Sequence, residues 1–274
     1  MRVGVLAMAP ATDRHRRAAT LLRDQRLRRI PIESLPADCR PRDELEGYAV
    51  QEALHGLLAG AGLGPVAGHK IGCTTPIMQA YLGIRNPCAG GVLAATVHDG
   101  EARVRHADYV RVGAECEIAV RLGADLGPAG APFDRARVAP AVEACLAAME
   151  IVDDRYRDYR GLDVPTLIAD DFFNAGCVLG SPVTRWRDLD LRALTGVTRL
   201  NGAEMGRGEG KAVMGHPFEA LAWLANLRAR LGLGLRAGEF VLLGSVVEVR
   251  WVKPGDAVAV AIEGLGEVRT LFEA

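Results

Sequence analysis

Two carboxylates stand one residue apart in the segment GAECEIAVRL, residues 113–122, whose other residues are typical of a buried strand. Successive side chains of a strand alternate between its faces, so Glu115 and Glu117 are expected to share one face while the apolar side chains share the other. Two such carboxylates, about 7 Å apart at the backbone, repel each other, and burial adds to the cost of ionising them unless a cation lies between them. The pair therefore predicts either a solvated edge strand or a face that binds a cation.

A third carboxylate extends this pattern. Glu150 follows the apolar run CLAAM, where a helix expected over about 135–149 gives way to a short extended segment. A charged side chain in such surroundings is costly without a partner, and the alternative is a surface residue at the C-terminal end of that helix. Three carboxylates without a cluster of His or Cys ligands would form an all-oxygen site, which suits Mg²⁺ or Mn²⁺ rather than zinc or copper.

A lysine would complete the charge balance of such a site. Three carboxylates and one divalent ion leave one negative charge, so an anionic substrate would need another cation nearby. Lys70, in GHKIGCTT, is the candidate, because the flanking Gly68 and Gly72 allow close approach of the backbone. The alternative is a surface lysine on an edge strand.

Composition limits the class of partner. The chain has 274 residues, a formal net charge of -1 and 49% hydrophobic residues, without the basic stripe that nucleic-acid binding requires. No apolar run is long enough to cross a membrane, and the first residues lack the order of a signal peptide, so we expect a cytoplasmic protein that binds neither nucleic acid nor membrane. Its cysteines show no paired spacing and are expected to be free, mostly buried thiols.

The elements that must position these residues change in character near residue 64. Helical spacing appears in AATLLRDQRL and in DELEGYAVQEALHGLLAGAGL, with a proline-containing loop between them. From residue 64 onward, short β-prone segments predominate, interrupted by helices expected over about 135–149 and 217–231. We therefore expect a helical N-terminal region over 1–63 and an α+β catalytic domain, dominated by sheet, over 64–274.

Taken in order, these segments resemble the fumarylacetoacetate hydrolase superfamily, and within it the branch of 2-keto-4-pentenoate hydratases and 2-oxo-3-enedioate decarboxylases. The resemblance runs from about residue 45 to the end of the chain. It rests on the segments AVQEAL, GHKIGCTT followed by LGI, AECEIAV, MEIVDDR, IADDFFNAGCVLG, GHPFEALAWLANLRARLG and AGEFVLLGS with KPGDAVAVAIEGLGEV. Each segment is weak alone, but seven in the same order are specific.

The resemblance implies a mixed β-sheet roll like the C-terminal domain of the family. It also implies that Glu115, Glu117 and Glu150 bind Mg²⁺ or Mn²⁺, that Lys70 is the active-site lysine, and that Ser245 lies at the edge of the pocket. The implied activity is hydration of a 2-hydroxy-2,4-dienoate or 2-oxo-enoate in aromatic-compound catabolism, with a small 2-oxo acid as substrate and a homo-oligomer as the assembly. Arg155 is a further candidate for the substrate, the alternative being a solvated loop or subunit contact over 153–160.

This sequence departs from the family pattern at several places. Cys88 stands in NPCAGG where hydratases of this branch commonly have an aspartate, Asp171 stands where an asparagine is more common, and GSVV replaces the usual run near the C-terminus. A thiol is a poor substitute for a carboxylate base, although Cys88 would still lie close to the substrate. Decarboxylation of a 2-oxo-3-enedioate or hydrolysis of a C–C bond is therefore the alternative reaction. A non-catalytic subunit that binds a keto acid is the alternative of another class.

Overall fold

The computed structural model describes residues 11–274, except for the side chains of Pro76 and Tyr81. Its sheets have seven and five strands, in the orders β2-β1-β10-β5-β6-β7-β3 and β4-β12-β11-β8-β9. The strands are β1 (Val66–Gly72), β2 (Cys88–Leu93), β3 (Val97–Asp99), β4 (Glu101–Arg105), β5 (Val112–Leu122), β6 (Val142–Asp153), β7 (Asn174–Leu179), β8 (Thr195–Leu200), β9 (Ala203–Glu209), β10 (Phe240–Trp251), β11 (Ala257–Ile262) and β12 (Gly266–Glu273).

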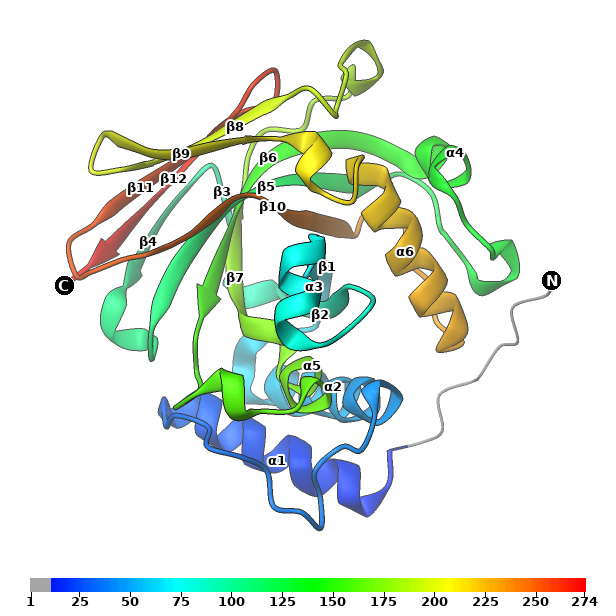
Figure 1. Ribbon diagram of the computed structural model, residues 1–274, viewed down its shortest axis with the longest axis vertical. Coiled ribbons are helices and arrows are strands. Elements are labelled where there is room, and N and C mark those ends of the chain that lie inside the picture. Colours follow the sequence, from blue (N-terminus) through cyan, green and yellow to red (C-terminus); the bar gives the residue numbers. More distant parts are fainter. Residues whose placement is uncertain (1–10) are drawn as a thin grey trace.

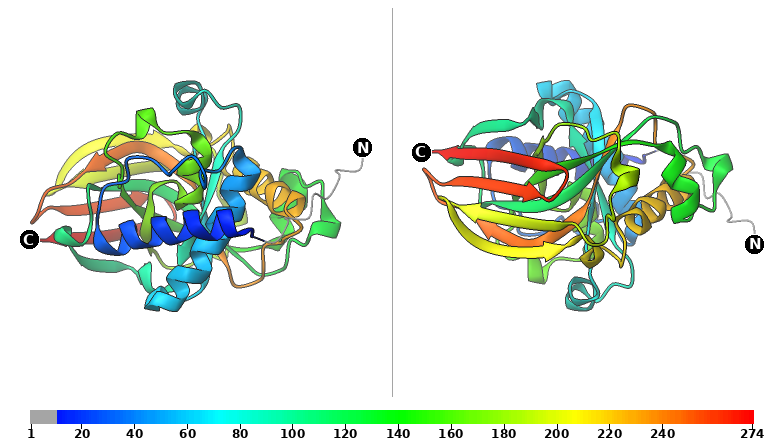
Figure 2. Two further views of the ribbon diagram at one scale, coloured as in Figure 1. Left: turned by 90° about the horizontal axis from the view of Figure 1, so that it is seen from below. Right: turned by 90° about the horizontal axis from the view of Figure 1, so that it is seen from above.

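Helices lie around these sheets rather than within them. Figure 1 shows α1, α2 and α5 grouped at one end of the molecule, with α6 along another side, and the two views of Figure 2 show the same grouping. None of the helices in the described part of the chain is long and apolar enough to span a membrane. The α-helices are α1 (Asp13–Arg28), α2 (Glu44–Leu58), α3 (Pro76–Leu82), α4 (Arg135–Val138), α5 (Val164–Ala169) and α6 (Pro217–Arg230).

Local sequence signals explain where the longer helices begin. The side chain of Asp43 accepts a hydrogen bond from the Glu46 backbone N–H at the start of α2. His216 caps α6 in the same way, with Pro217 in the first turn, where no backbone N–H is needed. The helices expected in the first 63 residues and over 217–231 are thus confirmed.

The alternation expected in residues 113–122 is also confirmed. Ile118 and Val120 belong to the main core cluster, whereas Ala119, which shares its face with the two glutamates, belongs to a smaller cluster on the other side of the sheet. Full burial of each large aliphatic side chain contributes roughly 1.5–3 kcal/mol, and this burial holds β5 in register. The glutamates are carried on that strand without contributing to the main core.

The prediction of a helix over 135–149 is wrong. Only Arg135–Val138 is α-helical, and β6 occupies Val142–Asp153. Pro140 has no backbone N–H to continue the helix, and β6 is buried on both faces, so its apolar run lacks the alternation by which strands are usually found. Glu150 therefore lies within a central strand and not beyond a helix.

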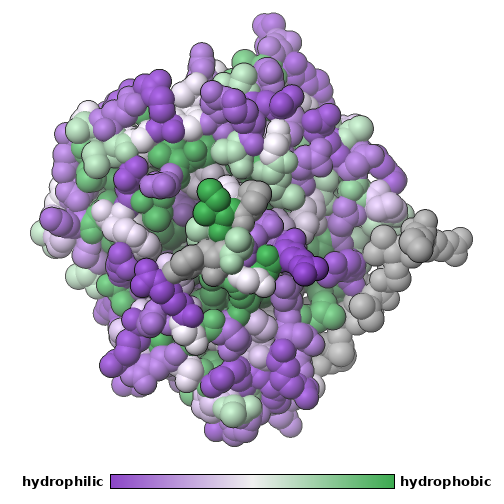
Figure 3. Space-filling view, in the orientation of Figure 1, coloured by the Kyte–Doolittle hydropathy of each residue, from purple (hydrophilic) through white to green (hydrophobic). Residues whose placement is uncertain are grey.

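The helix α3 follows β1 directly and lies in the centre of the view in Figure 1. Its Ile77 side chain is 80% exposed, and Met78 is also exposed. Figure 3 shows apolar side chains gathered at the centre of the same face.

Candidate active site

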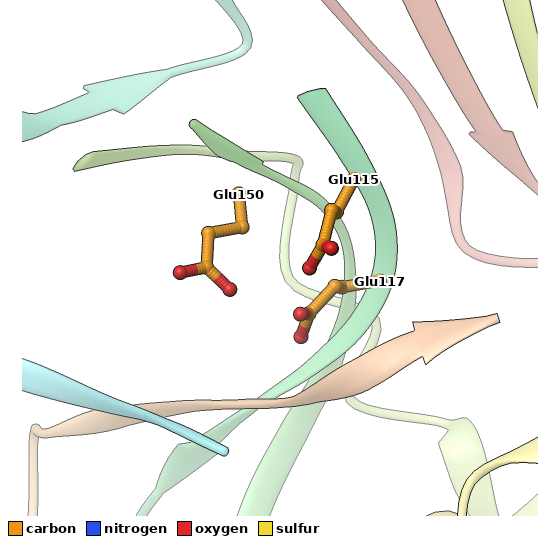
Figure 4. Close-up of side chains that lie close together, drawn as sticks. All are labelled: Glu115, Glu117 and Glu150. Atoms are coloured by element: carbon orange, nitrogen blue, oxygen red, sulfur yellow. The ribbon is translucent and has the colours of Figure 1, made fainter. Parts of the chain in front are cut away.

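Antiparallel pairing of β5 with β6 brings the three glutamates together. Glu115 lies directly opposite Glu150 in the register, and Glu117 lies two residues further along the same face of β5. One carboxylate oxygen from each side chain lies within 4.8 Å of the others. Figure 4 shows the three side chains converging from the two strands. Two of the ligands thus come from one strand, and its neighbour supplies the third.

Two of these carboxylates are fully buried, and part of their hydrogen-bonding capacity is unused. Glu117 and Glu150 are inaccessible to solvent, while Glu115 is half-buried. Glu117 Oε2 accepts a hydrogen bond from the Gly244 backbone N–H at 2.8 Å, and Glu150 Oε1 accepts one from Asn174 Nδ2 at 2.9 Å. Glu117 Oε1 and Glu150 Oε2 have no hydrogen-bond partner among the described residues. Unpartnered buried oxygens on two neighbouring carboxylates fit a divalent cation, which prefers oxygen ligands of this kind.

Burial and mutual repulsion raise the pKa values of two of these glutamates. Burial, and then the charge of Glu150, raise the pKa of Glu115 to about 7. Burial and the charges of Glu150 and Glu115 raise the pKa of Glu117 well above its ordinary value. A cation between these side chains would favour their ionised forms and reverse this effect.

Lys70 lies beside the cluster, buried on β1 between β2 and β10. The alternative of a surface lysine on an edge strand is therefore wrong. Its Nζ is 3.3 Å from Glu150 Oε1 and donates a hydrogen bond to the Phe172 carbonyl oxygen at 2.8 Å. Burial opposes its positive charge, but the charges of Glu150, Glu115 and Glu117 outweigh burial and raise its pKa. A charged ammonium has three N–H donors, so one remains for a substrate.

The segment DDFFN, residues 170–174, supplies the groups that hold Lys70 and Glu150. Asp171, Phe172 and Phe173 have left-handed backbone conformations with φ values of 58°, 47° and 71°. Such conformations cost about 1–3 kcal/mol for each non-glycine residue and persist only where surrounding contacts impose them. Here the strained turn directs the Phe172 carbonyl at Lys70, and Asn174 directs its amide at Glu150.

Ser245 lies beside the cluster, and its role stays a prediction. It is opposite Glu117 in the pairing of β10 with β5. Its Oγ donates a hydrogen bond to the Val247 carbonyl oxygen at 2.6 Å. The side chain is half-buried.

The structure places Cys88 and Arg155 around the cluster rather than in contact with it. Cys88 is buried at the start of β2, opposite Gly72, and burial raises its pKa well above the ordinary value. Arg155 is also buried, so the solvated-loop alternative is wrong for this residue. Its Nε donates to Asp170 Oδ2 at 2.8 Å, and its Nη1 donates to the Asn174 carbonyl oxygen at 2.8 Å. Their roles toward a substrate stay predictions.

Sequence reasoning missed the groups that hold the site residues in place. They are the Phe172 carbonyl, the Gly244 N–H and the side chain of Asn174. The first two are backbone groups and leave no signal in residue type. Asn174 was visible only as a polar residue at the start of an apolar segment.

Comparison with known proteins identifies the family of this chain. The model of the family described as fumarylacetoacetate (FAA) hydrolase C-terminal matches residues 91–273. The chain belongs to the fumarylacetoacetate hydrolase family. The matched range contains the three glutamates, and Lys70 precedes it.

Similar proteins in this family include hydratases and a decarboxylase. A 2-keto-4-pentenoate hydratase of Paraburkholderia phymatum is 36% identical over 256 residues, which cover 93% of this chain and 95% of that protein. A 4-oxalocrotonate decarboxylase of Pseudomonas putida is 32% identical over 208 residues, covering 76% of this chain and 77% of that one. The solved structure of the 4-oxalocrotonate decarboxylase from Pseudomonas putida G7, complexed with magnesium and adipate, has a TM-score of 0.88 and 26% identity, covering 96% of this chain and 100% of that chain. The roll-like α+β fold predicted from the sequence is confirmed by this likeness.

Proposed function

We propose that this chain is a divalent-metal-dependent hydratase that acts on a 2-hydroxy-2,4-dienoate in aromatic-compound catabolism. The observation that carries the proposal is the convergence of Glu115, Glu117 and Glu150 beside the buried Lys70. Hydratase relatives that align over 93% of the chain support hydration as the reaction.

The donor set supports Mg²⁺ or Mn²⁺ as the metal. Glu115, Glu117 and Glu150 would hold it, and the unpartnered oxygens of Glu117 and Glu150 would become ligands. When bound, the ion would act as a Lewis acid toward the 2-oxo carbonyl of the substrate. Magnesium in the solved decarboxylase structure is consistent with this choice.

Lys70 would stabilise negative charge or transfer a proton during the reaction. The substrate changes from 2-hydroxypenta-2,4-dienoate to a 2-oxo-3-enoate as the hydroxyl proton leaves oxygen and a proton is added at C5. Water then adds its hydroxyl at C4 and a proton at C3. The free N–H of Lys70 would stabilise negative charge on the substrate oxygen or move the proton in these steps.

Charge favours a substrate with one carboxylate. Lys70 forms an ion pair with Glu150, and no other Lys or Arg forms one with the three glutamates in the described part of the chain. The charges of three carboxylates, Lys70 and one divalent ion cancel, so a single substrate carboxylate leaves one negative charge. A dicarboxylate would leave two negative charges instead of one. Decarboxylation of an oxo-enedioate is therefore the second candidate reaction. It is retained because a decarboxylase shares the fold closely.

The test is a metal-dependent assay. With Mg²⁺ restored after chelation, the protein should consume the ultraviolet absorbance of 2-hydroxypenta-2,4-dienoate, and Glu117→Gln should abolish the reaction. Glu46→Gln, on the side of α2 that faces Arg14 of α1, should leave the rate unchanged. Absence of turnover with both Mg²⁺ and Mn²⁺ would contradict the proposal, and release of CO₂ from an oxo-enedioate at a higher rate would favour the decarboxylase.

The catalytic-domain boundary at residue 64, the cytoplasmic location and the homo-oligomer stay predictions. The same holds for the alternative of a non-catalytic keto-acid-binding subunit. Such a subunit would be stabilised by oxalate and metal without consuming any dienoate.

A further inference from the structure

We propose that Asp171 is a positioning residue for Lys70, and that it ties the helices α1 and α2 to the active site. The hydrogen bonds of the Asp171 carboxylate go to His55, Gly91 and Arg26, and not to Glu115, Glu117 or Glu150. Asp171 acts on the residue that follows it, whose carbonyl oxygen holds the ammonium of Lys70. The catalytic consequence rests on the function proposed above, whereas the structural consequence does not.

Three elements converge on the buried carboxylate of Asp171. Its Oδ1 lies 2.6 Å from His55 Nε2 on α2 and accepts a hydrogen bond from the Gly91 backbone N–H on β2 at 2.9 Å. Its Oδ2 accepts a hydrogen bond from Arg26 Nη1 on α1 at 2.9 Å. Asp171 itself is inaccessible to solvent. A carboxylate held from three directions fixes the backbone that carries it.

Close packing against β2 explains how the turn reaches this position. A Cβ on Gly90 would lie 2.5 Å from the Asp171 carbonyl oxygen, and one on Gly91 would lie 2.6 Å from the His55 ring. Larger residues at either position would push the turn or His55 away. The glycine pair that follows Cys88 thus makes room for the turn of Asp171.

The position of the turn decides where Lys70 points. The Phe172 carbonyl oxygen accepts a hydrogen bond from Lys70 Nζ, and the Phe172 ring centroid lies 5.4 Å from the same atom. Glu150 Oε1 forms an ion pair with a second side of the Lys70 ammonium, and the third N–H of Lys70 stays available. Residues 171–173 are in left-handed conformations that would relax without the anchor. Loss of the Asp171 carboxylate should therefore release Lys70 from one of its two fixed contacts.

Chemical labelling tests the hold on Lys70 directly, without substrate. The other lysines of the sequence, Lys211 and Lys253, are exposed and serve as internal references in acetic anhydride labelling followed by peptide mass spectrometry. Asp171→Ala should raise the labelling rate of Lys70 relative to the references at least about tenfold, because local opening controls access to a buried amine. Where this variant does not fold, His55→Leu removes one of the three donors and should raise the rate about threefold.

The matched control is Glu46→Gln. Glu46 joins α2 to α1 through Arg14, at 2.6 Å, but does not touch the turn. It should leave the labelling of Lys70 unchanged. An equal increase in this control, or no increase in Asp171→Ala and His55→Leu, would overturn the proposal.

Kinetics separate positioning from general loss of structure. In Asp171→Ala, kcat should fall at least about tenfold while KM and the Mn²⁺ dissociation constant change less than about threefold, since the carboxylate ligands are untouched. Asp171→Asn should recover part of kcat, because its carbonyl oxygen, in the place of Oδ1, can accept hydrogen bonds from both the Gly91 N–H and His55 Nε2. The recovery should be incomplete, because its amide group, in the place of Oδ2, faces Arg26 and cannot accept a hydrogen bond from it. Loss of Mn²⁺ affinity in parallel with kcat would overturn the positioning role. Absence of turnover in the unaltered protein would contradict the hydratase proposal and leave the labelling result standing.

Discussion

Replacing Glu115 by glutamine should stabilise the protein when no metal is bound. The raised pKa of about 7 means that the folded state holds a proton that the unfolded state has already released above about pH 4.5. Stability contributed by this group therefore falls as the pH rises through that window. Each pH unit between the two pKa values corresponds to about 1.4 kcal/mol, so ionised Glu115 costs about 3 kcal/mol at about pH 8.

Urea unfolding with a chelator present measures this cost. Glu115→Gln should be more stable than the unaltered protein by up to about 3 kcal/mol at about pH 8, and the two should converge near pH 4.5. Saturating Mg²⁺ should narrow the gap at pH 8 by at least about 2 kcal/mol, because the metal stabilises the folded protein that has all three ligands.

The opposite sign is expected at Glu46, which makes it the control. Hydrogen bonding from Arg42 lowers the pKa of Glu46 to about 2, so its charge stabilises the folded state above about pH 4.5. Glu46→Gln should therefore be less stable at about pH 8, and this loss should fade as the pH falls toward 2. A Glu115→Gln protein less stable than the unaltered one in chelator at pH 8, or a gap that does not change with pH, would refute the reasoning.

Three further substitutions separate the roles around the cluster. Lys70→Met should lower kcat about 10²–10⁴-fold in the dienoate assay without weakening Mn²⁺ binding measured by electron paramagnetic resonance, because the lysine is a proton and charge donor and not a ligand; weaker Mn²⁺ binding would contradict that role. Cys88→Ala should keep kcat within about threefold, since a buried thiol whose pKa is raised stays protonated and cannot act as a base; a larger loss would make the thiol a participant. Arg155→Met should destabilise the protein by about 3 kcal/mol in urea unfolding, because it removes the ion pair at 2.8 Å from the buried Asp170 and leaves Arg26, at 4.0 Å, as the remaining cation; a change in KM with intact stability would instead indicate substrate binding.

The strand that carries the first two glutamates was predictable because its pattern is local. Alternation places Ile118 and Glu117 on opposite faces, and both the strand and its polar face follow from residue type alone. The choice between a solvated edge and a cation-binding face was not local. It depended on which strand pairs with β5, and that strand was expected to be a helix.

Glu150 was selected as a candidate ligand although the secondary structure predicted for its segment was wrong. Burial of β6 on both faces removed the alternation that would have indicated a strand. The resemblance to a family nevertheless picked out the residue. Only the register, with Glu115 opposite Glu150, explains why the two side chains meet.

The turn at Asp171 could not have been predicted from the sequence. Its partners come from residues 26, 55 and 91, and its backbone adopts conformations that phenylalanine and aspartate rarely take. Local propensity argues against such a turn, and contacts distant in sequence impose it. Residues that break local rules in this way are expected near functional sites.

A crystal structure with Mn²⁺ and oxalate tests the central claim most directly. We expect one manganese ion, located by its anomalous scattering, with an oxygen from each of Glu115, Glu117 and Glu150 and two oxygens from oxalate as ligands. Lys70 Nζ should lie within hydrogen-bonding distance of the oxalate. Manganese bound away from these carboxylates, or oxalate bound without contact to the ion, would contradict the account.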